Sequence, residues 1–193
     1  IGADYGVVIS ASHNSGEYNG IKVFNSEGYK LGDKEEERIE RCFIHEKTND
    51  FPDIGSYEQD LHLIKRYREF LLNAVEHSFA GKTIVLDGAF GAAHRIAPDV
   101  FRRAGASVIA ANCVDDGLSI NRNCGAVYPH NLARKVLRYK ADMGFAFDGD
   151  ADRLIAVDEH GDVIDGDMIL CALAKYFDAQ GKLPCRTAVG TSH

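Results

Sequence analysis

The sequence lacks the features that mark several common classes of protein. Its five cysteines are irregularly spaced and form no CxxC pair, which argues against both a zinc knot and a disulfide scaffold. No basic block occurs and the net charge is −7, so a general nucleic-acid-binding surface is not expected. No apolar run approaches the length of a membrane span, so no membrane partner is expected either. The five cysteines are therefore expected to be reduced thiols, which favours a cytoplasmic location.

The chain also lacks a visible signal peptide and an initiating methionine, since it begins at Ile1. We therefore expect a fragment or a processed chain, for which the missing leader excludes little. Apolar residues make up 45% and charged residues 26%, which are the proportions of an ordinary folded globule. A length of 193 residues allows one or two domains with a hydrophobic core.

β-branched segments alternate with helical periods along the chain, and this predicts an α/β fold with a largely parallel sheet. The expected strands are residues 5–9, 21–24, 29–31, 83–87, 107–111, 142–148, 154–158 and 186–190. The expected helices are residues 33–46, 63–74, 91–104, 131–140 and 167–179. Pro98 is expected near the start of its helix, where proline is tolerated. Residues 47–59 are the best candidate for a linker.

The strongest chemical feature is the acidic stretch "FAFDGDADRLIAVDE" at residues 145–159. Asp148, Asp150 and Asp152 alternate with small residues directly after an apolar strand, and a turn there can bring three carboxylates to one point. Their mutual repulsion would be costly without a cation, and hard oxygen ligands select Mg²⁺ or Ca²⁺. Arg153 follows directly and could hold an anionic group beside the metal.

Three interpretations of this stretch compete: a solvated acidic turn, an EF-hand calcium loop in a non-catalytic module, and a magnesium site for phosphoryl transfer. The EF-hand spacing is deceptive, because Asp148, Asp150 and Asp152 occupy loop places one, three and five and Glu159 falls at place twelve. Place six, which requires glycine, holds Arg153, and the flanks are strand-like where an EF-hand needs helices. The magnesium site is therefore favoured.

A second loop, "ISASHNSGEYNGIK" at residues 9–22, follows the first predicted strand. It is neither a P-loop nor a G-x-S-x-G nucleophile elbow, and adjacent residues such as Ser12 and His13 rarely face each other as nucleophile and base. It could be a polar loop that only caps the strand. Phosphoryl transfer would connect the two loops, because a phosphoserine needs the cation, and Lys22, Arg153 and loop amides offer donors.

The motifs "SASHN" (10–14), "NGIK" (19–22) and "DGDADR" (148–153) together resemble the phosphoserine and metal loops of the α-D-phosphohexomutases. Within that superfamily the segments "LDGAFGAAHRIAPDVFRRAGA" (86–106), "DGLSINRNCGA" (116–126) and "VDEHGDVIDGDMIL" (157–170) look most like the bacterial phosphoglucosamine mutase branch. The resemblance covers nearly the whole chain. Its most discriminating element is "INRNCG", since the sibling branches usually differ there.

The resemblance implies a role for each matching residue. Ser12 would carry the phosphoryl group, and Asp148, Asp150 and Asp152 would bind one Mg²⁺ per active site together with the Ser12 phosphate. Lys22 would assist proton transfer as acid or base. Arg153 would contact the transferring group as a catalytic and phosphate-binding residue, as Lys22 also would. His13 and Asn14 would belong to the same loop as Ser12, His13 as a catalytic residue and Asn14 as a phosphate-binding one.

The resemblance also implies the activity: an intramolecular phosphotransferase of the isomerase class that interconverts glucosamine 6-phosphate and glucosamine 1-phosphate through a bisphosphate. A sibling phosphomannomutase or phosphoglucomutase is the alternative within the superfamily. Either enzyme would take a phosphohexose as its partner.

The chain departs from the family pattern at a few positions. Ser15 stands where the family commonly has proline, Ala151 replaces a frequent glycine, and "NCGA" replaces the usual "NCGS". None of these changes removes a reacting group.

The family has four domains, and the resemblance implies three pieces of it here: the end of the first domain at 1–60, the second at 61–162 and the start of the third at 163–193. The sugar-recognition and substrate-phosphate loops would lie outside the chain, so we expect these 193 residues alone to be inactive. The partial pieces would leave apolar edges open, so we expect either a homodimer contact or missing parts of the natural protein to cover them.

Overall fold

The computed structural model describes residues 2–45 and 55–184. The chain forms two compact units, which are described separately. Unit 1 comprises residues 1–10 and 19–66, and unit 2 comprises residues 11–18 and 67–193. The serine loop, residues 11–18, therefore belongs to unit 2. The predicted domain boundaries at residues 60 and 162 stay predictions.

Unit 1 contains an antiparallel hairpin of β1 (Tyr5–Ile9) and β2 (Ile21–Asn25), in register with Val7 opposite Val23. Both strands were predicted from their alternating apolar residues. The expected third strand at 29–31 is reduced to a single bridge with β2. The turn before it is closed by the Asn25 side chain, which accepts from two backbone N–H groups.

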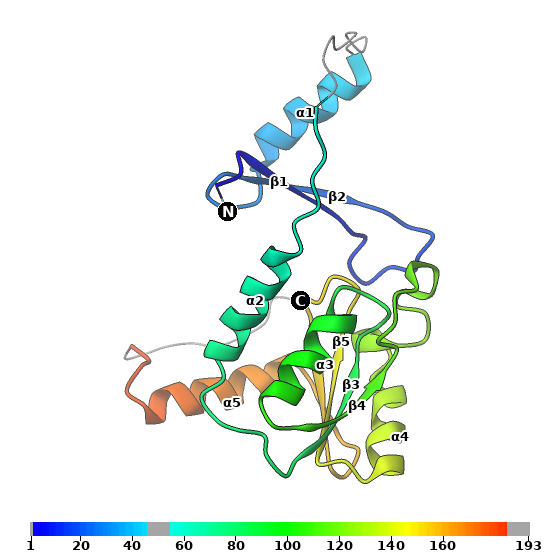
Figure 1. Ribbon diagram of the computed structural model, residues 1–193, viewed down its shortest axis with the longest axis vertical. Coiled ribbons are helices and arrows are strands. Elements are labelled where there is room, and N and C mark those ends of the chain that lie inside the picture. Colours follow the sequence, from blue (N-terminus) through cyan, green and yellow to red (C-terminus); the bar gives the residue numbers. More distant parts are fainter. Residues whose placement is uncertain (1, 46–54, 185–193) are drawn as a thin grey trace. The chain divides into compact units, whose positions relative to one another are not determined.

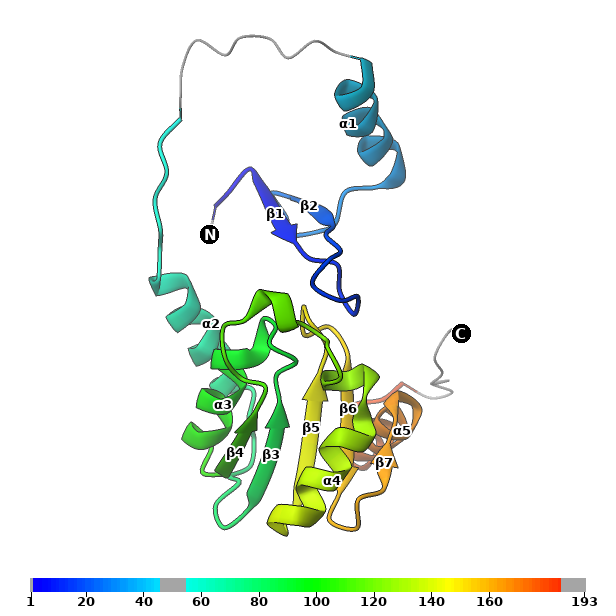
Figure 2. The same ribbon diagram turned by 90° about the vertical axis from the view of Figure 1, so that its right-hand side faces the viewer.

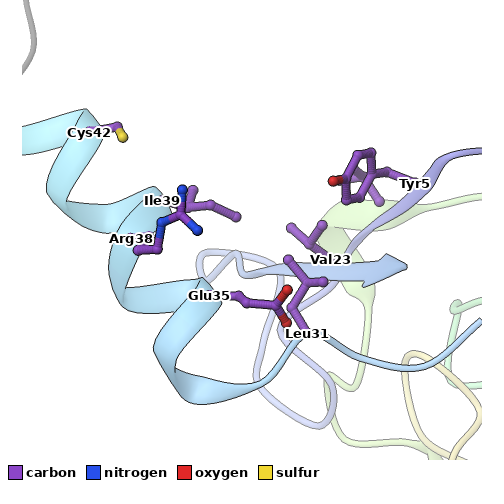
Figure 3. A pocket seen from close by; sticks show the side chains of 8 residues that line it. Tyr5, Val23, Leu31, Glu35, Arg38, Ile39 and Cys42 are labelled. Atoms are coloured by element: carbon purple, nitrogen blue, oxygen red, sulfur yellow. The ribbon is translucent and has the colours of Figure 1, made fainter. Parts of the chain in front are cut away.

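Helix α1 (Asp33–His45) follows the hairpin and has acidic residues in its first turn, where they favour the positive end of the helix dipole. Ile39 of this helix and apolar side chains of the hairpin line a pocket of about 480 Å³ (Figure 3). The apolar lining consists of Tyr5, Val7, Val23, Leu31 and Ile39. Most of these side chains are partly or largely exposed, and the homodimer that such surfaces suggested stays a prediction.

Unit 2 is built on a five-stranded sheet, counted over the described residues, in the order β4–β3–β5–β6–β7. The strands are β3 (Thr83–Asp87), β4 (Ser107–Ala111), β5 (Met143–Phe147), β6 (Leu154–Asp158) and β7 (Val163–Ile164). The first three strands in the sheet order are parallel to one another, which places their carboxyl ends at the same edge. The acidic stretch follows β5 at this edge, and Ser12 of the serine loop is hydrogen-bonded to it.

The expectation of a largely parallel sheet is wrong for its second half. Strands β5, β6 and β7 pair antiparallel. The connections 148–153 and 159–162 are too short for a crossover helix, which a parallel pair requires, so each makes a hairpin instead. The acidic stretch therefore forms the tip of a β-hairpin.

Helices cover both faces of the sheet in unit 2, which gives the predicted three-layer α/β/α arrangement. Helix α4 (Pro129–Tyr139) lies on one face, and α3 (Ala93–Arg103) and α5 (Gly166–Ala179) lie on the other (Figures 1 and 2). Helix α2 (His62–Asn73) precedes β3 and crosses the boundary between the units. Two 3₁₀ turns, η1 (Gly117–Ser119) and η2 (Gly125–Val127), follow β4.

The core of unit 2 follows from the two-residue period of β3, because successive side chains point to opposite faces. Val85 packs with Leu132 and Val136 of α4, whereas Ile84 and Leu86 pack on the other side with small residues of α3. All five of these side chains are fully buried. Burial on both faces explains why β3 reads as a continuous apolar run.

Pro98 lies inside α3, so the expectation that it marks the helix start is wrong. The helix begins five residues earlier, at Ala93. Ala93 and Ala97 are buried against the sheet, and this packing holds the turn before the proline in helical geometry. Tertiary packing has here overridden the local preference that proline expresses.

The predicted strand at 186–190 lies outside the described residues. Across residues 2–45 and 55–184, none of the helices combines the length and the apolar character needed to cross a membrane.

Candidate active site

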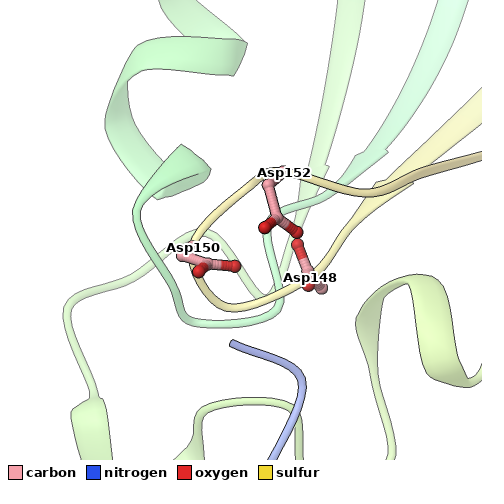
Figure 4. Close-up of side chains that lie close together, drawn as sticks. All are labelled: Asp148, Asp150 and Asp152. Atoms are coloured by element: carbon pink, nitrogen blue, oxygen red, sulfur yellow. The ribbon is translucent and has the colours of Figure 1, made fainter. Parts of the chain in front are cut away.

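The three aspartates of the acidic stretch converge in the turn between β5 and β6 (Figure 4). The backbone N–H of Ala151 donates to the carbonyl of Asp148 over 3.1 Å, and this bond closes the turn. One carboxylate oxygen from each of Asp148, Asp150 and Asp152 lies within 4.8 Å of the other two. Asp148 is fully buried, Asp150 is half-buried and Asp152 is exposed, so the cluster opens toward solvent on one side.

Asp148 is the buried member of the cluster, and its surroundings oppose its charge. Burial raises the pKa of this carboxyl, and the neighbouring charges of Asp152 and Asp150 raise it further. Two hydrogen bonds act in the opposite direction: the backbone N–H of Arg153 donates to Oδ1 over 3.2 Å, and Ser12 Oγ donates to Oδ2 over 3.2 Å. A cation at this point would remove the electrostatic cost.

The hydrogen bond from Ser12 joins residues that are 136 positions apart in the sequence. The proximity of the serine loop and the acidic stretch, expected from sequence, is thus observed within unit 2. Ser12 has a φ of +54°, in the left-handed region that side-chain-bearing residues seldom adopt. Such a conformation persists only where the surroundings hold it.

The other predicted site residues are placed as follows. The side chain of Arg153 is 55% exposed, and its Nε lies 3.9 Å from Asp148 Oδ2. His13 and Asn14 are exposed residues of the serine loop. Lys22 lies on β2 in unit 1, opposite Val8, and its role in proton transfer stays a prediction.

The acidic turn is supported by residues at the end of β3. This support was not predicted from the sequence. Asp87 is fully buried and accepts hydrogen bonds from the backbone N–H of Ala89 over 3.0 Å and from Asn112 Nδ2 over 2.9 Å. These bonds order the loop after β3, whose Ala92 N–H donates to the carbonyl of Gly149 over 2.8 Å. Asp87 therefore stabilises the loop after β3, and this loop in turn holds the backbone at Gly149, between Asp148 and Asp150.

Glycine is required at position 91 for this contact. A Cβ atom on Gly91 would lie 2.2 Å from the carbonyl oxygen of Gly149, which is closer than any real contact allows. The loop after β3 and the acidic turn can therefore meet only because this side chain is absent.

Asn121 is the second residue that the sequence analysis missed. It is buried, and its Nδ2 donates to the carbonyl oxygens of both Ser12 and Asn14, each over 2.8 Å. The signal was present in the "INRNCG" element, which was used only to separate branches of a superfamily. Nothing in the spacing alone connected this asparagine with a loop more than a hundred residues earlier.

Ala151 occupies a strained position in the acidic turn, with a φ of +62°. Its replacement by glycine should stabilise the chain by roughly 0.5–1 kcal/mol, because glycine adopts this conformation without a Cβ clash. Urea denaturation followed by circular dichroism would measure the change. The matched control is Ala172→Gly in the middle of α5, which should destabilise by about 1 kcal/mol. A loss of stability in both variants would show that the turn gains nothing from glycine.

The EF-hand interpretation does not fit the observed flanks. The acidic turn lies between the paired strands β5 and β6, with Phe147 opposite Leu154, whereas an EF-hand loop connects two helices. The donor set itself suits a hard divalent cation, since it consists of carboxylate oxygens with one buried member. The residues present therefore fit a Mg²⁺ ion.

The fold and this site define an α/β protein whose serine hydroxyl is hydrogen-bonded to a carboxylate cluster able to hold a metal ion. The model of phosphoglucomutase/phosphomannomutase alpha/beta/alpha domain I matches residues 1–50, and that of domain II matches residues 65–161. The chain belongs to the phosphoglucomutase/phosphomannomutase family.

Curated relatives that carry the name phosphoglucosamine mutase are similar to the chain over nearly all of its length. The protein from Alkaliphilus oremlandii is 46% identical over 193 residues, which cover 98% of this chain and 43% of that protein. The protein from Clostridium beijerinckii is 47% identical over 195 residues, with the same coverage of 98% and 43%. The chain thus spans less than half the length of these relatives.

Solved structures share the fold. A phosphoglucomutase/phosphomannomutase family protein from Burkholderia thailandensis superposes with a TM-score of 0.77 at 27% identity, over 93% of this chain and 39% of the other. Aspergillus fumigatus N-acetylphosphoglucosamine mutase, solved in complex with GlcNAc-6P and magnesium, superposes with a TM-score of 0.61 at 19% identity, over 94% of this chain and 50% of the other.

Proposed function

We propose that the full-length protein containing this chain is a phosphosugar mutase that interconverts glucosamine 6-phosphate and glucosamine 1-phosphate. The observation that carries the proposal is the hydrogen bond from Ser12 Oγ to Asp148 inside the aspartate cluster. A phosphoryl group on Ser12 would lie beside three carboxylates, an arrangement that is tolerable only with a cation between them. The names of the curated relatives support glucosamine phosphate as the substrate.

In this proposal Asp148, Asp150 and Asp152 hold Mg²⁺, and phosphoserine Ser12 is its further ligand. When bound, the ion would supply positive charge that offsets the carboxylates and the transferring phosphoryl group. The exposed guanidinium of Arg153, anchored beside Asp148 through its backbone N–H, would contact the same group from the solvent side. His13 and Asn14 would line the phosphate-binding loop.

The reaction would proceed in two transfers. A free hydroxyl of the sugar monophosphate attacks the phosphorus on Ser12, the Oγ–P bond breaks, and Lys22 accepts the hydroxyl proton as general base. The sugar is then a bisphosphate. Lys22 passes its proton to the freed Ser12 Oγ, and the bisphosphate then presents its other phosphoryl group. Ser12 Oγ attacks this second phosphorus, the bond from that phosphorus to the sugar oxygen breaks, and Lys22 transfers the Oγ proton to the freed sugar oxygen. The serine ends phosphorylated again, so the cycle is balanced.

A glucose or mannose phosphate mutase is the second candidate, because the matching family models carry those names. The family resemblance also implies that the sugar-recognition loop would lie outside this chain. Assays of the full-length protein with glucosamine, glucose and mannose 6-phosphates would separate the candidates. We expect kcat/KM for the glucosamine substrate to exceed the others by about tenfold or more.

A preference for glucose or mannose phosphate in that assay would favour the sibling activity, and no turnover of any of the three would refute a mutase. The 193-residue chain, assayed in parallel, is expected to be inactive because productive geometry needs both ends of the substrate held. Measurable turnover by this chain alone would contradict that expectation.

A further inference from the structure

We infer that Asn121 is a positioning residue that clamps the serine loop so that Ser12 Oγ faces the aspartate cluster. The inference rests on the proposed function for its kinetic consequence, but its structural part stands on contacts alone. Nδ2 of Asn121 is the donor in two hydrogen bonds of 2.8 Å to the carbonyls of Ser12 and Asn14, which lie on either side of His13.

The amide of Asn121 is oriented by this pair of bonds. The residue is 5% exposed, and among the described residues its Oδ1 atom has no hydrogen-bond partner. A buried amide that is satisfied only on its donor side is costly, because buried polar groups normally have all their partners. The two hydrogen bonds that Nδ2 donates to the serine loop offset the cost of leaving Oδ1 unpaired.

The backbone at Asn121 and at Gly149 has the conformation and the space that this contact requires. Asn121 has a φ of +57°, a conformation that asparagine tolerates, and its own N–H donates to the carbonyl of Ala89 over 3.0 Å. A Cβ on Gly149 would lie 2.5 Å from the Ser12 carbonyl oxygen and 2.8 Å from Asn121 Nδ2. The acidic turn therefore also leaves space for the Ser12 carbonyl and the amide that holds it.

The same segment of unit 2 holds the far end of the serine loop. A Cβ on Gly16 would lie 2.6 Å from the carbonyl oxygen of Gly117 and 3.1 Å from that of Leu118, both of which belong to η1. The loop thus lies against residues 117–121 at two points, Ser12–Asn14 and Gly16. These contacts explain how Ser12 is kept in a left-handed conformation that it would otherwise leave.

A clamp of this kind should act on the chemical step, because small displacements of a reacting group cost large factors in rate. The test variant is Asn121→Asp, which keeps the shape of the side chain and its tolerance of the left-handed conformation but removes the N–H donors. It places a carboxylate against two carbonyl oxygens. The matched control is Asn131→Asp, since Asn131 Nδ2 also donates to a carbonyl, that of Asn123 over 2.7 Å, which is not a residue of the serine loop.

In the full-length protein, Asn121→Asp should lower kcat by about 100-fold with less than a threefold change in KM. The affinity for Mg²⁺ should change less than about threefold, because the Asn121 amide donates to backbone carbonyls of the serine loop and not to the carboxylates. Deuterium uptake by a peptide covering residues 10–18 should become about tenfold faster, since the loop loses its two bonds. Asn131→Asp should leave kcat and the uptake of this peptide within about twofold of wild type.

Equal uptake of the 10–18 peptide in Asn121→Asp and wild type would overturn the clamp, whether or not the protein proves to be a mutase. Faster uptake together with a wild-type kcat would overturn its role in positioning. A wild type that turns over no hexose phosphate would refute the proposed function, while the exchange result would still decide the clamp. If Asn121→Asp fails to fold, Gly16→Ala decides: we expect a kcat loss of about tenfold or more with Mg²⁺ affinity retained, and a wild-type kcat would overturn the inference.

Discussion

Replacement of Ser12 by alanine in the full-length protein should lower turnover by about 10⁴-fold or more, while the fold stays intact. The hydroxyl is the proposed acceptor and donor of the phosphoryl group in both transfers, so alanine leaves the phosphoryl group without its point of attachment. Structurally the substitution removes the hydrogen bond from Oγ to Asp148, and such a bond contributes on the order of 1 kcal/mol. A coupled assay would measure turnover, and mass spectrometry would show the loss of phosphate from the 10–18 peptide.

The matched control for this experiment lies in the same loop. Ser15 Oγ donates to Glu17 Oε1 over 3.0 Å, and this hydroxyl does not contact the aspartates in any described hydrogen bond. Ser15→Ala should therefore keep turnover within about threefold of wild type. A Ser12→Ala protein that retained more than a tenth of wild-type turnover would rule out the covalent route. In that case a phosphoryl group would have to pass directly between substrate molecules.

Much of the fold was predictable from periodicity, because its strands are short apolar runs bounded by turns. Strands β3, β4 and β6 begin and end where the sequence predicts, and the helices differ only at their ends. Errors occur where local and tertiary preferences disagree. Pro98 signals a helix start, but the buried alanines before it pack on β3 and extend the helix. The antiparallel half of the sheet follows from loop length, which the alternation of strands and helices concealed.

The residues with proposed chemical roles were predictable, and the residues that support them were not. A carboxylate triad after a strand has few interpretations, and the serine loop gained meaning once the two motifs were considered together. Asn121, Asp87 and Gly91 act through contacts with backbone atoms distant in sequence, so no local pattern distinguishes them from ordinary loop residues. Only coordinates show that an amide at 121 meets the carbonyl at 12.

Replacement of Asp148 by asparagine should affect the metal-free and the metal-bound protein in opposite directions. Without metal, the buried carboxylate is destabilising because its charge is removed from water next to two other acids, as the direction of its pKa shift indicates. Asparagine fits the same space, and its carbonyl oxygen can still accept the hydrogen bond from the Arg153 N–H. We therefore expect the metal-free variant to melt a few degrees above metal-free wild type, a shift that corresponds to about 1 kcal/mol.

With Mg²⁺ the order should reverse. The ion binds the folded state alone and raises the melting temperature of wild type, whereas the variant has lost one of three carboxylate ligands. We expect its Mg²⁺ affinity to fall by about 100-fold, and turnover of the full-length protein by about 10³-fold. Calorimetric titration and thermal melts with and without the ion would measure these effects.

Asp142→Asn is the matched control for the charge change. It removes the same charge from the residue just before β5, at the end of that strand opposite to the acidic turn, where Asp142 pairs with Lys82 over 2.8 Å. Its metal response should equal that of wild type, even if its stability falls in both conditions. Because Asp148→Asn alone combines a metal-free gain with a metal-bound loss, a general change in packing or net charge cannot produce the same result. Retention of wild-type Mg²⁺ affinity by Asp148→Asn would place the ion somewhere other than this turn, and the proposed phosphoryl chemistry at Ser12 would lose its cation.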